Sequence, residues 1–240
     1  MHFSDLADLA RFRLLLESRC PLEEQTVAIG NRTYRVLACP DVEALLDRVD
    51  TEAGLEDFPY GVSLWPAAVA LAKWLAQRAG EMPGLSVLEL GCGVGLPGIV
   101  ARTLGAEVVQ SDYLREAMDL ARYNAAVNGV EGISYLMADW RSFDHRRTYD
   151  LVIGADILYT RSLHRELSHI LARVVAPGGR LALTDPVRPQ SVEMVDRLES
   201  DGWLLDMTGI PVQFRGEENH VALFEGIRRD GRRNSSGGTR

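Results

Sequence analysis

The sequence predicts an α/β fold, with a doubly wound, mostly parallel seven-stranded sheet, an antiparallel C-terminal hairpin strand, and an N-terminal extension made of a helix and a β-hairpin. Three observations predict this class. From Leu85 onward, short apolar strand patterns alternate with helical patterns. The connections between them are short, and a glycine-rich turn follows the first of these strands. Repeated strand–helix units with short loops are typical of parallel sheets with right-handed crossovers.

Residues 1–64 precede this alternation, and we expect them to form a partial lid. Leucines at near-helical spacing predict a helix over residues 4–19, with Ser4 suited to its N-cap. Two short strand patterns flank a Gly30-Asn31 turn and predict a β-hairpin. A short helix is predicted at 41–49, and residues 58–61 (Phe-Pro-Tyr-Gly) are expected to line the opening of the lid.

The main domain is predicted at residues 65–226. It opens with a largely apolar helix that has Pro66 in its first turn. The fourth predicted strand is apolar throughout, which favours the centre of the sheet, and no helical pattern separates the last two strands, which predicts a hairpin at one edge. A helix starting at Ser162 is expected to stop at Pro177 and Gly178. The strands are predicted at 86–90, 107–112, 133–139, 149–156, 180–185, 203–209 and 220–226, and further helices at 96–104, 115–129 and 191–202.

The composition narrows the class of protein. With 240 residues, 46% hydrophobic and 25% charged, the chain is expected to form one soluble domain with an appendage. No run approaches the roughly 18 apolar residues that cross a bilayer, and no apolar signal core is present, so we expect a cytoplasmic protein without a membrane partner. The three cysteines lack pairing spacing, which favours a reducing compartment, and the five histidines form no metal-binding set.

The charge is unevenly distributed. Residues 227–240 carry five arginines and one aspartate, a net charge of +4, and are predicted to be a disordered basic tail. The whole chain has a net charge of −8, so the remainder carries −12. Because such an acidic body binds phosphate backbones poorly, nucleic acid is an unfavourable partner.

A glycine loop lies where α/β folds bind ligands. The segment VLELGCGVGLPG places Gly91, Gly93 and Gly95 at the carboxyl end of the first strand of the main domain. Residues 93–98 also fit the dinucleotide pattern GxGxxG. If the strand ends at Leu90, however, the spacing is GxGxG and Glu89 lies two positions before the first glycine. A carboxylate repels a pyrophosphate but suits the ammonium and sulfonium groups of S-adenosylmethionine.

Polar residues also follow the next two strands. Asp112, which precedes Tyr113, ends the second strand about twenty residues after the loop, where a carboxylate can accept from both ribose hydroxyls of an adenosine ligand. After the third strand, Asp139 could accept from the adenine amino group and Trp140 could cover a ring face. Packing of Trp140 in the core is equally consistent with the sequence.

This combination resembles the class I (seven-β-strand) S-adenosylmethionine-dependent methyltransferases. ELGCGVG is similar to their first motif, Asp112 to the ribose-binding acid, and Asp139-Trp140 to the adenine-side motif. The similarity covers roughly residues 65–226. It implies a Rossmann-like sheet and S-adenosylmethionine as the cofactor. The implied cofactor-binding residues are Trp65, Glu89, Gly91, Gly93, Gly95, Asp112, Tyr113, Asp139, Trp140 and Ala155.

The end of the fourth strand, GADILYT, resembles the Asp-x-x-Tyr motif of a group that includes protein-lysine methyltransferases. The segments SLWPAAVALAKWL and NAAVNG are similar to that group as well, although methyltransferases of the ribosomal L11 type share the second. The resemblance implies protein-lysine methylation. Asp156 would orient the lysine ammonium, and Tyr159 would face it with its ring.

Three alternatives remain open at this point. The acceptor could be a small amine or a heteroaromatic nitrogen instead of a protein lysine. The glycine pattern at 93–98 could belong to an NAD-dependent oxidoreductase, although no Tyr-xxx-Lys pair is recognisable. A non-catalytic adaptor could bind the cofactor for stability alone.

Overall fold

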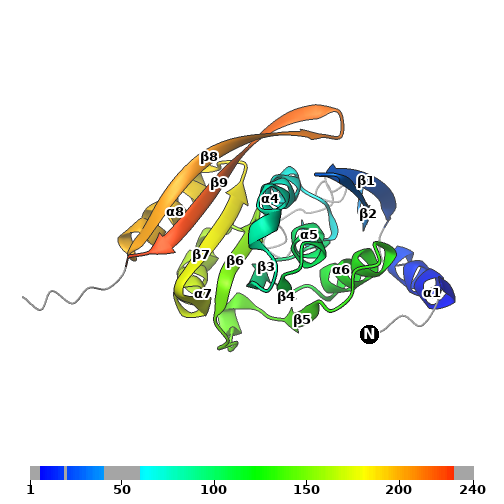
Figure 1. The fold of residues 1–240 in the computed structure, drawn as a ribbon, viewed down its shortest axis with the longest axis horizontal. Helices are drawn as coiled ribbons and strands as arrows, with labels where there is room; N and C mark the ends of the chain where they lie inside the picture. The colour runs from blue at the N-terminus through cyan, green and yellow to red at the C-terminus, as the bar shows by residue number, and fades with distance from the viewer. Residues whose placement is uncertain (1–5, 19–20, 41–59, 230–240) are drawn as a thin grey trace, which may run out of the picture.

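The computed structural model describes residues 6–18, 21–40 and 60–229, and its centre is a seven-stranded sheet (Figure 1). The strands, in chain order, are β3 (Ser86–Leu90), β4 (Glu107–Asp112), β5 (Ser134–Met137), β6 (Tyr149–Ala155), β7 (Val175–Asp185), β8 (Trp203–Phe214) and β9 (Glu217–Arg228). The predicted helix at 41–49, Phe58, Pro59, the predicted cap Ser4 and the tail beyond Arg229 lie outside the described residues.

The order of strands confirms the predicted fold class. It is β5-β4-β3-β6-β7-β9-β8, with parallel pairing from β5 to β7 and antiparallel pairing of β9 with both β7 and β8. The apolar strand β6 is the central strand, as its composition predicts. From β3 the next strands are added on one side, toward β5, and from β6 onward they are added on the other side. The strand order therefore reverses between β3 and β6, and open α/β sheets form their ligand crevices at such a point.

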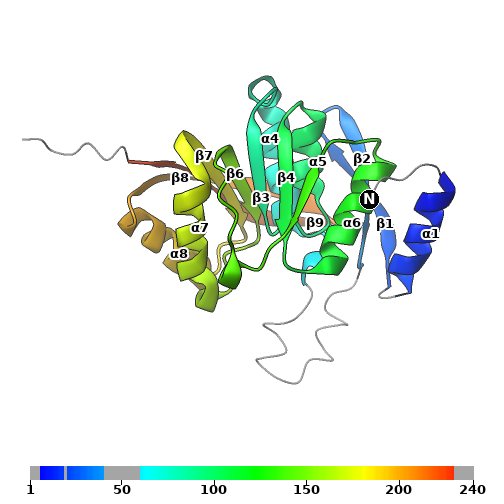
Figure 2. The ribbon, with the colours of Figure 1, turned by 90° about the horizontal axis from the view of Figure 1, so that it is seen from below.

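Helices cover both faces of this sheet (Figure 2). One core lies between the sheet and α4 (Pro66–Gln77), α5 (Leu96–Thr103) and α6 (Arg115–Val127), and a second lies under α7 (His164–Val174) and α8 (Pro189–Ser200). None of the helices in the described ranges has both the length and the apolar composition needed to cross a bilayer.

The boundary between α7 and β7 differs from the sequence prediction. The helix expected to stop at Pro177 and Gly178 ends at Val174, because Val175 already pairs with Tyr149 in β6. The register then shifts before Leu151, and residues 176–179 form the irregular part of β7. Breaking residues thus mark a bulge in a strand here, rather than the end of a helix.

The C-terminal hairpin is longer than predicted. Its ladder runs from the pair Trp203–Arg228 to the pair Phe214–Glu217, so β9 includes two residues assigned to the tail by the sequence. The turn residues Arg215 and Gly216 have φ values of 51° and 84°, the left-handed conformation of a tight hairpin turn. The residues near this turn belong to an edge hairpin, where the alternation of apolar and polar residues that marks a strand is weak. The sequence therefore predicts strands that are too short here.

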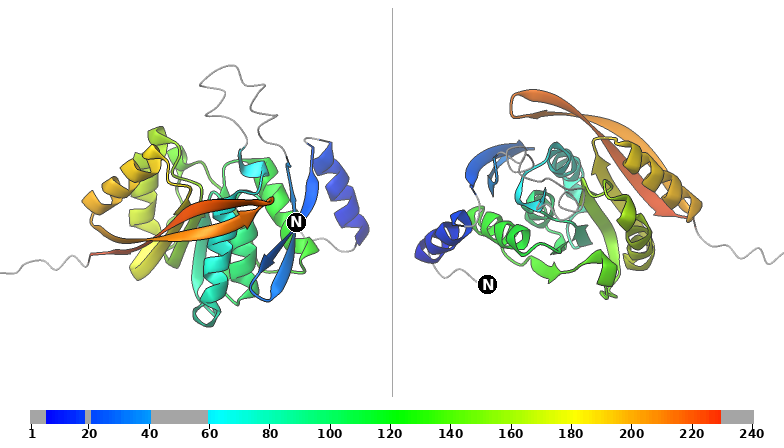
Figure 3. Two further views of the ribbon diagram at one scale, coloured as in Figure 1. Left: turned by 90° about the horizontal axis from the view of Figure 1, so that it is seen from above. Right: turned by 180° about the vertical axis from the view of Figure 1, so that it is seen from behind.

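The N-terminal extension packs against α6 (Figure 3). It consists of α1 (Leu6–Glu17) and a hairpin of β1 (Glu23–Ile29) and β2 (Arg32–Ala38). Asn124 on α6 and Asn128, the C-cap of that helix, hydrogen-bond to the backbone of Leu37 and Arg35 in β2. The Asn124 amide also donates to the carbonyl of Val94 in the glycine loop, at 2.9 Å. The extension is therefore linked to the loop through one buried side chain.

Candidate active site

A cavity opens at the carboxyl ends of β3, β4 and β6, beside the short 3-10 turn η1 (Tyr60–Val62). No residue of the described segments 6–18 and 21–40 lines it; among the described residues of the expected lid, Tyr60, Gly61 and Ser63 do so. The structure brings eleven of the twelve predicted site residues together here: Trp65, Glu89, Gly91, Gly93, Asp112, Tyr113, Asp139, Trp140, Ala155, Asp156 and Tyr159.

The glycine loop requires glycine for two physical reasons. Gly91 and Gly93 have φ values of 61° and 51°, which side chains rarely permit. A Cβ on Gly91 would also lie 2.8 Å from Cγ2 of Ile157, and one on Gly93 would lie 3.1 Å from the carbonyl oxygen of Gly61. Because Gly91 and Gly93 both line the cavity, this close packing also shapes the wall against which a ligand would lie.

Gly95 is the predicted site residue that lies outside this cavity. It is the N-cap of α5 with a φ of 87°, and a Cβ there would lie 2.8 Å from the Cβ of Ala121 in α6. Its carbonyl accepts a hydrogen bond from the Gln110 side chain at 2.8 Å. Gly95 therefore allows close packing of the loop on α6, a role that the motif alone does not distinguish from ligand contact.

Glu89 is a buried carboxyl beneath the loop. Its Oε2 accepts hydrogen bonds from the Gly98 amide at 3.0 Å and from Gln110 Nε2 at 2.8 Å. Burial raises the pKa of Glu89 to about 8, an effect only partly offset by these two donors. A cation in the cavity would favour its ionised form, so this side chain is suited to a positively charged ligand.

Asp112 holds the glycine loop in place. Its Oδ2 accepts from the Gly93 amide and its Oδ1 accepts from the Leu114 amide, each at 2.9 Å. Burial raises the pKa of this carboxyl, and the backbone donors oppose that rise. Asp112 thus fixes the shape of the loop, and it also lines the cavity. We call Glu89, Asp112 and residues 91–94 the loop wall.

Asp139 and Trp140 occupy the positions expected from the adenine-side motif. Asp139 caps the turn η3 (Trp140–Ser142) by accepting from the Arg141 amide at 2.9 Å, and 44% of its side chain is exposed. Cζ2 of Trp140 lies 3.7 Å from where a Cβ on Gly91 would be. The indole therefore faces the loop wall while also packing against the core under α7.

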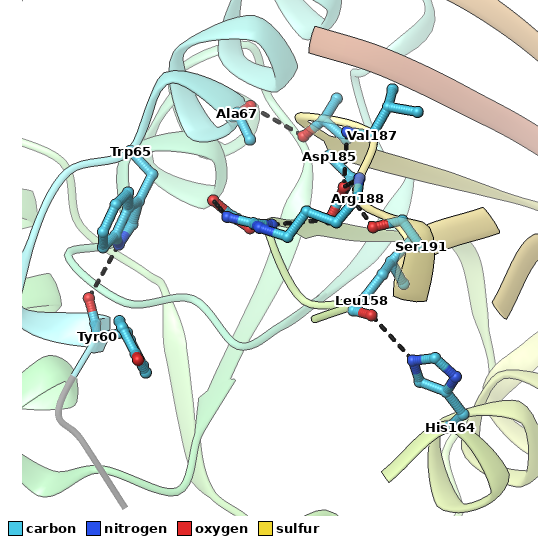
Figure 4. A network of polar contacts seen from close by, with 11 residues as sticks. Tyr60, Trp65, Ala67, Leu158, His164, Asp185, Val187, Arg188 and Ser191 are labelled. Carbon is cyan, nitrogen blue, oxygen red and sulfur yellow. Dashed lines mark hydrogen bonds and ion pairs between the residues drawn. The ribbon is translucent and has the colours of Figure 1, made fainter. Parts of the chain in front are cut away.

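Three rings form a second part of the cavity, which we call the aromatic wall (Tyr60, Trp65 and Tyr159; Figure 4 shows Tyr60 and Trp65). The Tyr60 and Tyr159 rings meet edge to face at 5.4 Å, and the Trp65 ring centroid lies 6.2 Å from that of Tyr60. Trp65 Nε1 donates to the Tyr60 carbonyl at 3.0 Å. Burial raises the pKa of Tyr159, so its ring is neutral and can face a cation.

An ion pair that the sequence analysis did not find fixes Asp156. Asp156 has a φ of 56°, and 9% of its side chain is exposed. Arg188 Nη1 donates to Oδ1 at 2.5 Å and Nη2 to Oδ2 at 3.4 Å. Burial raises the pKa of the Asp156 carboxyl, and Arg188 opposes this rise. The available signal was topological: β6 and β7 are neighbours, so residues that follow them meet at one edge.

Comparison with known proteins places this arrangement among methyltransferases. The histidine protein methyltransferase 1 homolog of Dictyostelium discoideum is 29% identical over 149 residues, covering 60% of this chain and 48% of the relative. Histone-arginine methyltransferase METTL23 of Xenopus laevis is 30% identical over 57% of this chain and 61% of its own length. Protein N-lysine methyltransferase METTL21A of Xenopus tropicalis is 32% identical, with shares of 53% and 61%.

The chain thus spans about half to three fifths of the length of these relatives. Among solved structures, magnesium protoporphyrin IX methyltransferase of Synechocystis PCC 6803 superimposes with a TM-score of 0.53 at 20% identity. The match covers 80% of this chain and 99% of that one, which supports the shared fold. A family model described as lysine methyltransferase matches residues 49–193, more than half of the sequence. With its motifs gathered around one cavity in the expected fold, the chain belongs to the lysine methyltransferase family.

Proposed function

We propose that this protein is an S-adenosylmethionine-dependent N-methyltransferase that modifies a protein side chain, with lysine as the acceptor. The observation that carries the proposal is that the loop wall and the aromatic wall line one cavity together with Asp156. The first suits a cationic nucleoside, and the second suits a cationic amine. The names of the relatives, which specify histidine, arginine and lysine of proteins, support a protein as the acceptor.

The loop wall fits the cofactor by its shape and its charge. Positive φ angles at Gly91 and Gly93 turn the loop backbone along the cavity, and Glu89 and Asp112 supply carboxyl groups to its lining. The related fold from Synechocystis was crystallised with bound S-adenosylmethionine. When bound, this cofactor supplies a methyl group on a positively charged sulfur, which keeps the bonding electron pair when nitrogen takes the methyl.

The acceptor side positions the nitrogen and excludes water. The acceptor must present a lone pair, so a lysine ammonium, with a reference pKa of ~10.4, first loses a proton. Asp156 can accept a hydrogen bond from the amine and orient it, while solvent takes the proton. The rings of Tyr60 and Tyr159 can stabilise the cation that forms. Catalysis is then mainly the alignment of two reactants in a dry site.

The alternatives make different use of the same cavity. An NAD-dependent oxidoreductase would place a pyrophosphate on the loop, but Glu89 lies directly beneath it and its carboxyl bonds the Gly98 amide. A small-amine acceptor would need only the aromatic wall. The buried thiols Cys39 and Cys92 support a reducing, cytoplasmic setting for any of these activities.

The test is methyl transfer from labelled S-adenosylmethionine into a cell lysate, resolved by size. The proposal expects label in a protein band and, after hydrolysis, in methylated lysine. Label at histidine or arginine would keep the enzyme class and change the acceptor. Label only in small molecules, or no label from a protein that binds S-adenosylhomocysteine, would contradict the proposal and favour a small-amine enzyme or an adaptor, respectively.

A further inference from the structure

Asp156 contacts both the cavity and a cation outside it. Its side chain lines the cavity, whereas Arg188 is not among the described residues that do so. We infer that Arg188 is a positioning residue for the acceptor: it holds the Asp156 carboxylate in the single orientation that faces the incoming amine. The inference rests on the proposed function and assigns a role to a residue that does not itself touch the acceptor.

The buried carboxylate of Asp185 contacts both the backbone amide and the guanidinium of Arg188. Asp185 is fully buried, and its Oδ1 accepts from Ser191 Oγ at 2.5 Å, from the Val187 amide at 2.9 Å and from the Arg188 amide at 3.3 Å (Figure 4). Its Oδ2 lies 3.4 Å from Arg188 Nη1. The same carboxylate therefore fixes the backbone that carries Arg188 and the guanidinium that meets Asp156. If Asp185 only stabilised a turn, its hydrogen bonds to the backbone amides would be enough, and the contact with the guanidinium would not be needed.

Backbone strain is concentrated at this ion pair. In the described chain, the non-glycine residues with positive φ are Asp156 at 56°, Val187 at 60° and Arg215 at 51°. Arg215 belongs to a hairpin turn, but the other two are an ion-pair partner and the residue before the other partner. A β-branched residue such as Val187 rarely adopts this conformation. Strain of this kind persists where the surroundings impose it, and it gathers at functional sites.

Charge gives the ion pair a second consequence. Among the described residues, the ionisable groups that act on Asp156 are Arg188 and Asp185, and those that act on Tyr159 beside it include Tyr60, Tyr113 and Asp112. Arg188 is the one cation in this set. Burial and the negative charge of Asp185 both favour a protonated Asp156, and Arg188 opposes both. Without Arg188, the pKa of the Asp156 carboxyl would rise. At a pH below that raised pKa the carboxyl would be neutral and would no longer attract a cation.

The experiment measures Asp156 directly in the full chain. Side-chain carboxyl titration by NMR, with the Asp156 signal assigned from Asp156→Asn, is compared between the wild type and Arg188→Gln. We expect the midpoint to rise by at least about one pH unit, a tenfold change in the protonated fraction at a given pH. Arg188→Lys keeps the charge, so its shift is expected to be smaller, and it provides a second variant if Arg188→Gln does not fold.

A matched control is Arg78→Gln, which removes an ion pair outside the cavity lining whose arginine is about as exposed as Arg188, 27% against 36%. Arg78 Nη2 lies 3.1 and 3.2 Å from the two carboxylate oxygens of Glu225, linking the end of α4 to β9. This variant should leave the Asp156 midpoint unchanged. An unchanged midpoint in Arg188→Gln, or a shift as large in the control, would overturn the inference.

The same variants then separate the inference from the proposed function. With the labelled protein band of the lysate as acceptor, Arg188→Gln is expected to lower kcat about tenfold or more and to move the acid limb of the pH profile upward, with S-adenosylhomocysteine affinity retained. A profile identical to wild type would overturn the positioning role. If the wild type labels nothing, the proposed function fails, while the NMR midpoint still decides whether Arg188 controls Asp156.

Discussion

The loop wall and Asp156 line the same cavity but are held in different ways. The loop wall is built from residues within one strand–turn–helix unit and its neighbour, and its carboxyls bond backbone amides. Asp156 is held by a guanidinium 32 residues away, on a loop with strained backbone. The first arrangement forms wherever the local motif folds. The second depends on the correct assembly of β6 beside β7.

The comparison predicts that the two parts can be disabled separately. Asp156→Asn keeps the shape of the side chain but removes the charge that orients the amine. We expect methyl transfer to fall about a hundredfold, since misplacement of a reactant can cost that much. Calorimetry should show S-adenosylhomocysteine binding within about threefold of wild type. Equal loss of binding and transfer would mean that the two parts of the cavity are not independent.

On the loop wall, Asp112→Asn should have the opposite pattern. An amide can keep one of the two backbone contacts but loses the charge, so cofactor affinity should fall about tenfold to a hundredfold. Equilibrium titration with S-adenosylhomocysteine measures this effect. Asp206→Asn, at an exposed position on β8, is the control and should bind as wild type does. Unchanged affinity in Asp112→Asn would remove Asp112 from the binding site.

These two parts also differ in how far the sequence predicts them. The alternation of strands and helices, the central position of β6 and the loop wall follow from apolar runs and glycine spacing, which are local signals. Arg188 was missed because its partner, Asp156, lies 32 residues away in another strand–helix unit. Gly95 was assigned to the cofactor because it continues the glycine spacing of the motif. Its place outside the cavity, with no room for a Cβ beside Ala121, distinguishes its role.

Packing beneath the loop is the next point to test. A Cβ on Gly98 would collide with Glu89 Oε2, so Gly98→Ala must displace a buried carboxyl. Overpacking of this kind typically destabilises by about 1–3 kcal/mol. Gly80→Ala is the control, because no atom lies within 4 Å of a Cβ there. Denaturant unfolding of both variants measures the difference. Similar stabilities would show that Glu89 moves freely.

The smallest expected effect is a pH dependence of stability. The folded pKa of Glu89 is raised to about 8, so the folded state holds a proton that the unfolded state releases. This group therefore stabilises fully below its unfolded pKa, and the contribution is lost as pH rises through about 8. Relative to Glu89→Gln, the wild type should lose about 2 kcal/mol of unfolding free energy between pH 6 and 8. A constant difference across this range would contradict the buried, protonated carboxyl.

The assignment of the cavity to methyl transfer depends most on which adenosine-containing ligand the loop wall accepts. Isothermal titration of the wild-type chain with S-adenosylhomocysteine, and separately with NAD, tests this directly. We predict saturable binding of one S-adenosylhomocysteine per chain and no heat of binding with NAD. Binding of NAD, or no binding of S-adenosylhomocysteine, would contradict the assignment of this cavity to methyl transfer.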